Sequence, residues 1–257
     1  AVGVANYPPP VPLAPTDLLR FAARHDIRYV QFGDNMPLHD LTEDELNQLA
    51  DTASDLHIHI QTGTRRLTVE NISRYLLIAE KLKSAFLRVV IDDEDFHPDE
   101  HQVIEAIRTL VPVLEKKRIR LAIENHDRFP ATALVNIIEQ TNPQLVGICL
   151  DTANSIGANE GVNEVVRVLG PYTINLHVKD ITIKRLPHKM GFNIEGCAAG
   201  KGVLNIPQVI GQLKHYNHCD TATLEVWSSP EPTIEESIAK EKRWVEASIH
   251  YLKTILS

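Results

Sequence analysis

Short runs of apolar, β-forming residues alternate with longer amphipathic segments along the chain. This alternation constrains the fold strongly, because two parallel strands need a crossover segment between them, usually a helix. The runs are rich in Val, Ile and Leu and lack strict alternation with polar residues, which is typical of strands buried on both faces. They cover residues 2–6, 27–33, 56–61, 86–91, 119–125, 145–150, 173–179 and 221–226. The sequence therefore predicts eight parallel strands separated by helices.

The amphipathic segments predict helices that include residues 42–54, 68–83, 98–117 and 234–256. Two of them begin with the spacing of a capping box, Thr42 with Glu45 and Thr233 with Glu236. Eight strand–helix units in 257 residues match an α/β fold of the closed (β/α)8 TIM-barrel type, as a single domain over residues 1–257. An open doubly wound sheet is the alternative, but no GxGxxG motif follows the first run, where three prolines come after Tyr7.

Composition and charge exclude several classes of protein. The net charge is −8 and no stripe of Lys and Arg is present, so nucleic acid is not an expected partner. The three cysteines have no CxxC spacing, which disfavours a disulfide framework and a cysteine zinc site. No run approaches ~18 consecutive apolar residues, and the first residues lack the positive charge of a signal peptide. We therefore expect no association with a membrane and a cytoplasmic location.

Acidic residues and a histidine stand at or just beyond the apolar part of the last four predicted strands. They are Glu124, Asp151, His177 and Glu225. Taken singly, each carboxylate has an ordinary explanation as the N-cap of the next helix. In a barrel, however, the carboxyl ends of the strands form one mouth, where three carboxylates would repel each other unless a cation binds. Oxygen and imidazole ligands suit Mn²⁺, Mg²⁺, Co²⁺ or Zn²⁺, so we predict one divalent metal ion as cofactor.

Five short motifs, taken together and in this order, resemble those of the xylose isomerase-like TIM barrels. They are Glu-Asn-His at 124–126, Leu-Asp-Thr-Ala-Asn at 150–154, His-Val-Lys-Asp at 177–180, Gly-Lys-Gly at 200–202 and Leu-Glu-Val at 224–226. The resemblance spans almost the whole chain and implies a sugar or sugar-phosphate isomerase or epimerase, with Mn²⁺ as the expected ion. It also implies that Glu124, Asp151, His177 and Glu225 are the metal ligands, and that Glu124 and Glu225 double as the catalytic acid–base pair.

Three residues outside this ligand set are predicted from strand parity to bind the substrate. His126 and Lys179 share parity with Glu124 and His177, so both should project toward the mouth, although a surface position just beyond the strand ends is an equal alternative. His59 would lie near the mouth if its face of the predicted strand 56–61 is the barrel interior. An ordinary hydrogen-bonded histidine inside the barrel is the alternative for His59.

Asn154, Arg185 and Arg88 complete the candidates. Asn154 stands where several ketose 3-epimerases of the similar family carry a substrate-binding histidine, so the resemblance is weakest for that activity. Residues 180–202 form the longest connection without a predicted element, and their mixed apolar and basic content favours a packed lid over a flexible tail, with a solvated loop of scattered charges as an equal alternative. The resemblance makes Arg185, in this lid, a substrate-binding candidate. Arg88, in an otherwise apolar strand, is either a buried partner for the carboxylates or an anchor for an anionic substrate.

The leading functional hypothesis is a metal-dependent isomerase or epimerase of a monosaccharide, sugar acid or sugar phosphate, which removes a proton next to a carbonyl to form an enediolate. A dehydratase of a dehydroshikimate-like or inosose-like polyol ketone is the alternative enzyme. An endonuclease-IV-like repair enzyme would need a trinuclear metal site with extra histidines, such as His57 and His59, and a basic face. A non-catalytic sugar-binding protein is a further alternative. The expected partner is a small sugar-like molecule, with a homo-oligomer left open.

Overall fold

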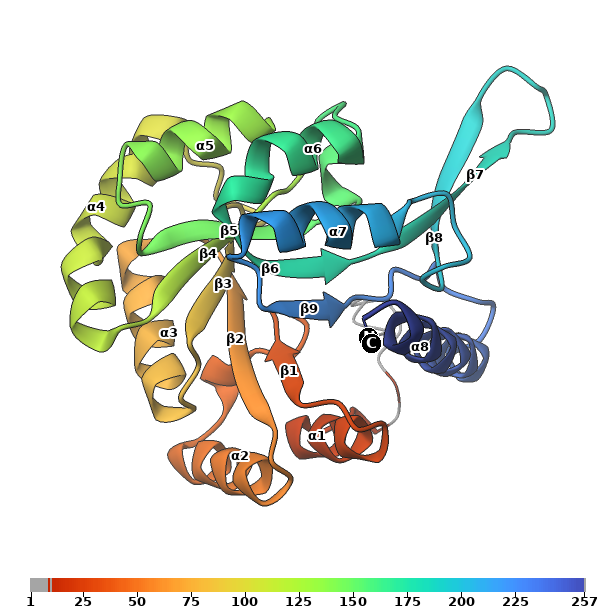
Figure 1. Cartoon of the computed structure of the whole chain (residues 1–257). Coiled ribbons are helices and arrows are strands. Elements are labelled where there is room, and N and C mark those ends of the chain that lie inside the picture. Colours follow the sequence, from red (N-terminus) through yellow and green to blue (C-terminus); the bar gives the residue numbers. More distant parts are fainter. Residues whose placement is uncertain (1–8, 10, 257) are drawn as a thin grey trace.

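The centre of the molecule is a sheet of seven parallel strands in the order β1-β2-β3-β4-β5-β6-β9. The computed structural model describes residues 9 and 11–256. The strands are β1 (Tyr29–Phe32), β2 (His59–Arg65), β3 (Phe86–Val90), β4 (Arg120–Glu124), β5 (Val146–Asp151), β6 (Thr173–Val178) and β9 (Thr221–Leu224). The two edge strands, β1 and β9, contact each other, so the sheet curves almost into a closed barrel (Figure 1). The prediction of a TIM barrel is confirmed, and the strand predicted at residues 2–6 lies outside the described residues.

Helices surround the outside of this sheet (Figure 1). They are α1 (Pro15–Arg24), α2 (Glu43–Asp55), α3 (Val69–Lys81), α4 (Glu100–Lys117), α5 (Ala131–Glu139), α6 (Val162–Leu169), α7 (Ile206–Tyr216) and α8 (Ile234–Leu256), with short 3-10 turns η1 (Leu38–Asp40), η2 (Asn154–Ile156) and η3 (Gly170–Tyr172). Both predicted capping boxes form, since the backbone amides of Glu45 and Glu236 each donate to the threonine three residues earlier. Within residues 11–256, no helix has the combination of length and apolarity needed to cross a bilayer.

The strands carry apolar side chains to both of their faces, as their composition predicts. Every residue of β3, β5 and β6 is buried. The barrel interior also contains a polar network, in which Gln31 donates to Asn175 at 3.2 Å and Asn175 donates to Thr221 at 2.8 Å. Buried amides need such partners to offset their desolvation. This network lies directly below the carboxyl ends of the strands and supports the side chains there.

Residues 180–202, predicted as a lid without regular structure, contain an antiparallel hairpin. Its strands are β7 (Asp180–Arg185) and β8 (Phe192–Cys197), and it projects away from the barrel (Figure 1). Apolar side chains near its turn face solvent, with Met190 87% and Phe192 57% exposed. The prediction of an element-free, packed lid is therefore wrong for the outer half of the segment. The two strands of the hairpin mix polar and apolar residues, which allows cross-strand pairing but forms no long apolar run from which a strand could be predicted.

The base of the hairpin is fixed to the barrel by Asp180. One of its carboxylate oxygens accepts hydrogen bonds from the backbone amides of Gly200 and Gly202, both at 2.9 Å. A side chain at Gly202 would place a Cβ 2.1 Å from the other oxygen of Asp180, so only glycine allows this close approach. The Gly-Lys-Gly turn thus serves to anchor the segment that borders the barrel mouth.

Candidate active site

The four predicted ligands converge at the carboxyl ends of their strands. Glu124 ends β4, Asp151 ends β5, His177 lies in β6 and Glu225 follows β9. Each offers one ligand atom, and these atoms all lie within 4.8 Å of one another. Glu124, Asp151 and His177 are buried, whereas the Glu225 side chain is 39% exposed. The parallel register pairs Asp151 with His177, and it pairs Glu124 with Cys149, two residues before Asp151.

Asp151 is held so that one oxygen remains available. Its Oδ1 atom accepts hydrogen bonds from the backbone amides of Ala153 and Asn154, both at 2.8 Å. Its own backbone amide donates to the Asn125 side chain at 2.6 Å, which fixes the end of the strand. The Oδ2 atom is buried and has no hydrogen-bond partner among the described residues. A buried carboxylate oxygen is costly unless a cation approaches it, and here the Lys179 ammonium does so, with Nζ 3.1 Å from Oδ2. A metal ion would compete with this ammonium for the oxygen.

His177 presents its Nδ1 atom to the same space. Its Nε2 atom lies 2.6 Å from the side-chain oxygen of Gln31, which can only accept, so Nε2 carries a hydrogen and donates. The Nδ1 atom is buried, has no hydrogen-bond partner within the described chain, and lies 2.9 Å from Glu225 and 3.3 Å from Glu124. Burial alone would lower the pKa of His177, but Cys149 and Glu124 raise this pKa well above its usual value. Without a metal the ring therefore holds a second proton on Nδ1, which a divalent ion would displace.

Gln31 is predicted to act as a positioning residue for this histidine. Gln31→Leu removes the acceptor for Nε2–H, so the ring loses its fixed tautomer and orientation, and we expect Mn²⁺ affinity to fall by about 10–100-fold. Gln31→Glu keeps an acceptor oxygen and should retain most of the affinity. Isothermal titration of the metal-free variants with Mn²⁺ measures both values. Equal affinity in Gln31→Leu and the parent chain would contradict this role.

Arg88 is a buried partner of the carboxylates. Its Nε atom donates to Glu124, and its Nη1 atom lies 2.9 Å from Asp34. Burial alone would raise the pKa of Glu124, but Arg88 and His177 outweigh this effect and hold the pKa below its usual value. Of the two options for Arg88 in the sequence, the structure favours the buried partner. Glu124 is therefore expected to be ionised at neutral pH.

Lys179 contributes a buried ammonium group to the site. Its Nζ atom lies 3.1 Å from Asp151, 3.0 Å from Glu225 and 3.0 Å from the side-chain oxygen of Asn154. Asn154 in turn donates to Glu124 at 2.8 Å, so its amide links the lysine to the carboxylate. Burial would lower the pKa of Lys179, but Asp151 and Glu225 raise it, and the ammonium stays protonated. The predicted projection of Lys179 into the mouth is correct.

A cavity of about 390 Å³ adjoins this group, within the range of small-molecule sites. His126, Asn154 and Lys179 line it, together with Ile194 of the hairpin and Trp227. Trp227 is 51% exposed and forms part of the wall. Three of the five predicted substrate-binding residues therefore border one cavity beside the four predicted ligands.

His59 and Arg185 do not lie at this site. β2 begins at His59, three residues later than predicted, and the register places Arg65, not His59, near the level of Glu124. His59 is exposed about 20 Å along the strand from that level, and it stacks on Tyr29. The expected position of His59 at the mouth is wrong, because the second half of β2 is polar and the apolar pattern does not reveal it as part of the strand. His57 is exposed before the same strand, so neither histidine extends the metal group.

Arg185 lies at the outer end of the hairpin. Its guanidinium packs over Phe192 at 4.4 Å and donates to the backbone oxygen of Lys189 at 2.9 Å. The structure therefore does not bring Arg185 to the cavity, because the strand extends it outward from the base at Asp180.

The residues of the site that were not identified from the sequence include Gln31 and Asn125. Each is a polar residue inside or directly after a run of apolar strand residues. That interruption is the available signal, because a polar side chain in a strand buried on both faces needs a specific partner.

The model of the family described as xylose isomerase-like TIM barrel matches residues 19–254. The chain belongs to this family. Among curated relatives, this xylose isomerase-like barrel is 27% identical to a 3-oxo-isoapionate decarboxylase of Pectobacterium atrosepticum over 245 residues, which cover 95% of this chain and 89% of the relative.

Solved structures share the fold at lower identity. D-psicose 3-epimerase of Clostridium cellulolyticum H10 superposes with a TM-score of 0.72 at 15% identity, covering 93% of this chain and 92% of that one. A xylose isomerase-like TIM barrel protein of Mycobacterium smegmatis in complex with magnesium gives 0.69 at 15% identity, covering 94% and 89%. The named relatives of this xylose isomerase-like barrel thus include enzymes that act on small sugar-like molecules.

Proposed function

We propose that this chain is a divalent-metal-dependent decarboxylase of a 3-oxo sugar acid. The observation that carries metal dependence is the convergence of four ligand atoms within 4.8 Å of one another. Two of them, Asp151 Oδ2 and His177 Nδ1, are buried without a hydrogen-bond partner in the described chain and face charged groups, the Lys179 ammonium and the two glutamates. Glu124 and Glu225 complete the proposed ligand set. An ion bound there supplies Lewis-acid stabilisation of the negative charge that develops on the substrate oxygens.

The charge of the site favours an anionic substrate. Three carboxylates, those of Glu124, Asp151 and Glu225, contact two cationic side chains. The cations are Arg88 and Lys179. Asp34, which also contacts Arg88, is balanced by Arg65 at 3.6 Å. With His177 neutral, a divalent ion converts this excess of one negative charge into an excess of one positive charge. A substrate carboxylate would restore neutrality.

In the metal-free chain, neighbouring cations keep both acid–base candidates, Glu124 and Glu225, ionised. Burial alone would raise the pKa of Glu225, but contacts with His177 and Lys179 hold it well below its usual value. Glu124 is held in the same way by Arg88. Carboxylates with lowered pKa values are weak general bases. In decarboxylation no base is needed, because the bond to the carboxylate carbon breaks, carbon dioxide leaves, and the electron pair stays on the substrate as an enediolate.

Lys179 is placed to complete the reaction. Its ammonium group, held by Asp151, Glu225 and Asn154, borders the cavity. Its raised pKa makes it a weak acid, but the enediolate carbon that lost carbon dioxide is a strong base and takes the proton from it. Solvent then returns a proton to the amine. His126 and Asn154 are proposed to bind substrate hydroxyl groups. The relative that decarboxylates 3-oxo-isoapionate supports this reaction class, since it matches this chain over nearly its full length.

Isomerisation or epimerisation is the second candidate. Glu124 and Glu225 reach His177 from two non-adjacent strands, so two carboxylates border the same space and could exchange protons with a substrate. Weak bases are sufficient if the bound ion acidifies the substrate.

A substrate panel in deuterium oxide tests the proposal. We expect the metal-free chain to be inactive, and Mn²⁺ to restore release of carbon dioxide from 3-oxo sugar acids with deuterium in the product. Nuclear magnetic resonance and a carbon dioxide assay read out both events. Deuterium exchange into neutral ketoses without carbon dioxide would favour the isomerase, and formation of an absorbing enone would indicate a dehydratase. Full activity after exhaustive chelation would contradict metal dependence.

A further inference from the structure

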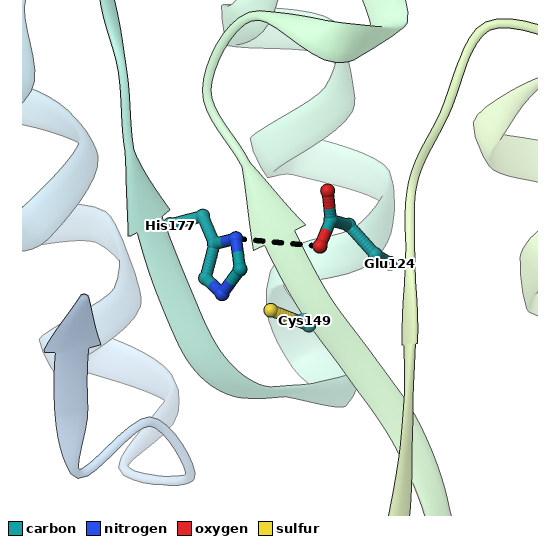
Figure 2. A group of neighbouring side chains, drawn as sticks. All are labelled: Glu124, Cys149 and His177. Atoms are coloured by element: carbon teal, nitrogen blue, oxygen red, sulfur yellow. Dashed lines mark ion pairs between the residues drawn. The ribbon is translucent and has the colours of Figure 1, made fainter. Parts of the chain in front are cut away.

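Cys149 lies below Asp151 and beside Glu124 of the four-ligand group. It is fully buried on β5, two residues before Asp151, and the register pairs it with Glu124 of β4. Strand residues two apart point to the same side, so Cys149 and Asp151 both face the barrel interior. Figure 2 shows its sulfur atom directed toward the imidazole ring of His177, near the carboxylate of Glu124. The ligand atoms of Glu124, Cys149 and His177 all lie within 4.8 Å of one another.

Two of these three groups have spare coordinating capacity. The Nδ1 atom of His177, whose residue is only 3% exposed, has no hydrogen-bond partner within the described chain and lies 3.3 Å from the Glu124 carboxylate and 2.9 Å from that of Glu225. The thiol of Cys149 makes one weak hydrogen bond, to Asn175 at 3.3 Å. A thiolate and an imidazole nitrogen are the ligands that softer divalent ions prefer.

We propose that Glu124, Cys149 and His177 form a second cation position, which takes a soft divalent ion such as Zn²⁺ or Cd²⁺. Binding forms a bond from the ion to the sulfur and releases the thiol proton to solvent. The position shares Glu124 and His177 with the group proposed to hold the functional ion. Because Nε2 of His177 is engaged by Gln31, Nδ1 is the nitrogen available to either ion, and only one ion binds at a time.

This arrangement distinguishes hard from soft ions. A hard ion such as Mn²⁺ prefers oxygen ligands and would therefore occupy the four-ligand group, which includes Asp151 and Glu225. A soft ion gains a thiolate ligand at the second cation position, where it no longer contacts Asp151 and Glu225. It would therefore block the site without supporting the reaction. The alternative for Cys149 is a purely structural role beside Phe86, Ala122 and Ile174.

Cadmium binding to a chain with Cys149 as its single thiol tests the proposal. The chain has three cysteines, so the background variant carries Cys197→Ser and Cys219→Ser. We expect one Cd²⁺ per chain with an ultraviolet thiolate-to-metal charge-transfer band. Adding Cys149→Ser should abolish the band and weaken Cd²⁺ binding by about 10–100-fold, while Mn²⁺ affinity stays unchanged. Titration of the Cd²⁺ form with excess Mn²⁺ should remove the band.

Circular dichroism verifies that each variant folds, and Cys149→Ala serves as a second substitution if the serine variant does not. Stoichiometric Cd²⁺ without the band, or a band that persists without Cys149, would overturn the proposal. Simultaneous binding of Cd²⁺ and Mn²⁺ would overturn the shared-ligand arrangement. A chain that binds Mn²⁺ but gives no cadmium band leaves the proposed function intact and removes this position alone, whereas a folded chain that binds neither ion removes both.

Discussion

Glutamine in place of Glu124 is expected to reduce turnover by more than about 100-fold, beyond the ~10–100-fold typical of a group that only supports a metal ligand. The substitution removes an anionic ligand atom and leaves the buried guanidinium of Arg88 with Asp34 as its remaining carboxylate partner. Glu225→Gln should act in the same direction, because it removes a ligand that also contacts His177 and Lys179. Steady-state kinetics over a range of Mn²⁺ concentrations, with calorimetric titration of the ion, measures both effects.

Glu105→Gln is the matched control for these variants. It makes the same chemical change in an exposed ion pair with Arg108, at 2.8 Å, on α4. Exposed pairs contribute little, so turnover and Mn²⁺ affinity should equal those of the parent chain. If Glu124→Gln and Glu225→Gln also behave like the parent chain, the four-residue group is not the reaction centre.

Methionine in place of Lys179 is expected to lower kcat by about 10²–10⁴-fold, the range for loss of a positioned proton donor. Mn²⁺ affinity should not fall, because the ammonium competes with a cation for Asp151 and Glu225. Lys179→Arg keeps the positive charge but does not give up a proton at neutral pH. We therefore expect Lys179→Arg to retain a KM near that of the parent chain while its kcat stays low.

Lys184→Met is the control, since Lys184 is 69% exposed on the hairpin. Its kinetic constants should match those of the parent chain. Normal release of carbon dioxide by Lys179→Met would exclude Lys179 as the proton donor. Loss of Mn²⁺ binding in that variant would instead indicate that the lysine is needed to build the site.

The convergence of the four proposed ligands was predictable from the sequence because strand ends carry them. Glu124, Asp151 and His177 occupy or end apolar runs, and Glu225 directly follows β9. Parallel strands of a barrel share one mouth, so residues far apart in the chain meet there by topology alone. His126, Lys179 and Asn154 reach the cavity for the same reason, since each lies on or just after one of these strands.

The positions of His59 and Arg185 were predicted wrongly because the strands that carry them contain polar or exposed residues. β2 continues through Thr62, Gly63 and Thr64, whereas the apolar pattern predicts a strand that ends at residue 61. His59 was therefore expected near the carboxyl end of the strand, but it lies at the amino end. The hairpin of β7 and β8 exposes several apolar side chains, and the position of Arg185 depends on how far that hairpin extends from Asp180.

The sequence alone determined the α/β barrel and the identity of the four proposed ligands, because the periodic placement of apolar residues and the polar strand ends are local properties of the chain. The tertiary structure decided which charges and lone pairs face each other. Gln31 orients His177 across 146 positions of sequence, Arg88 holds Glu124 ionised, and Cys149 lies below the site. Such contacts depend on side-chain direction and on distances between strands, which hydrophobic periodicity does not encode.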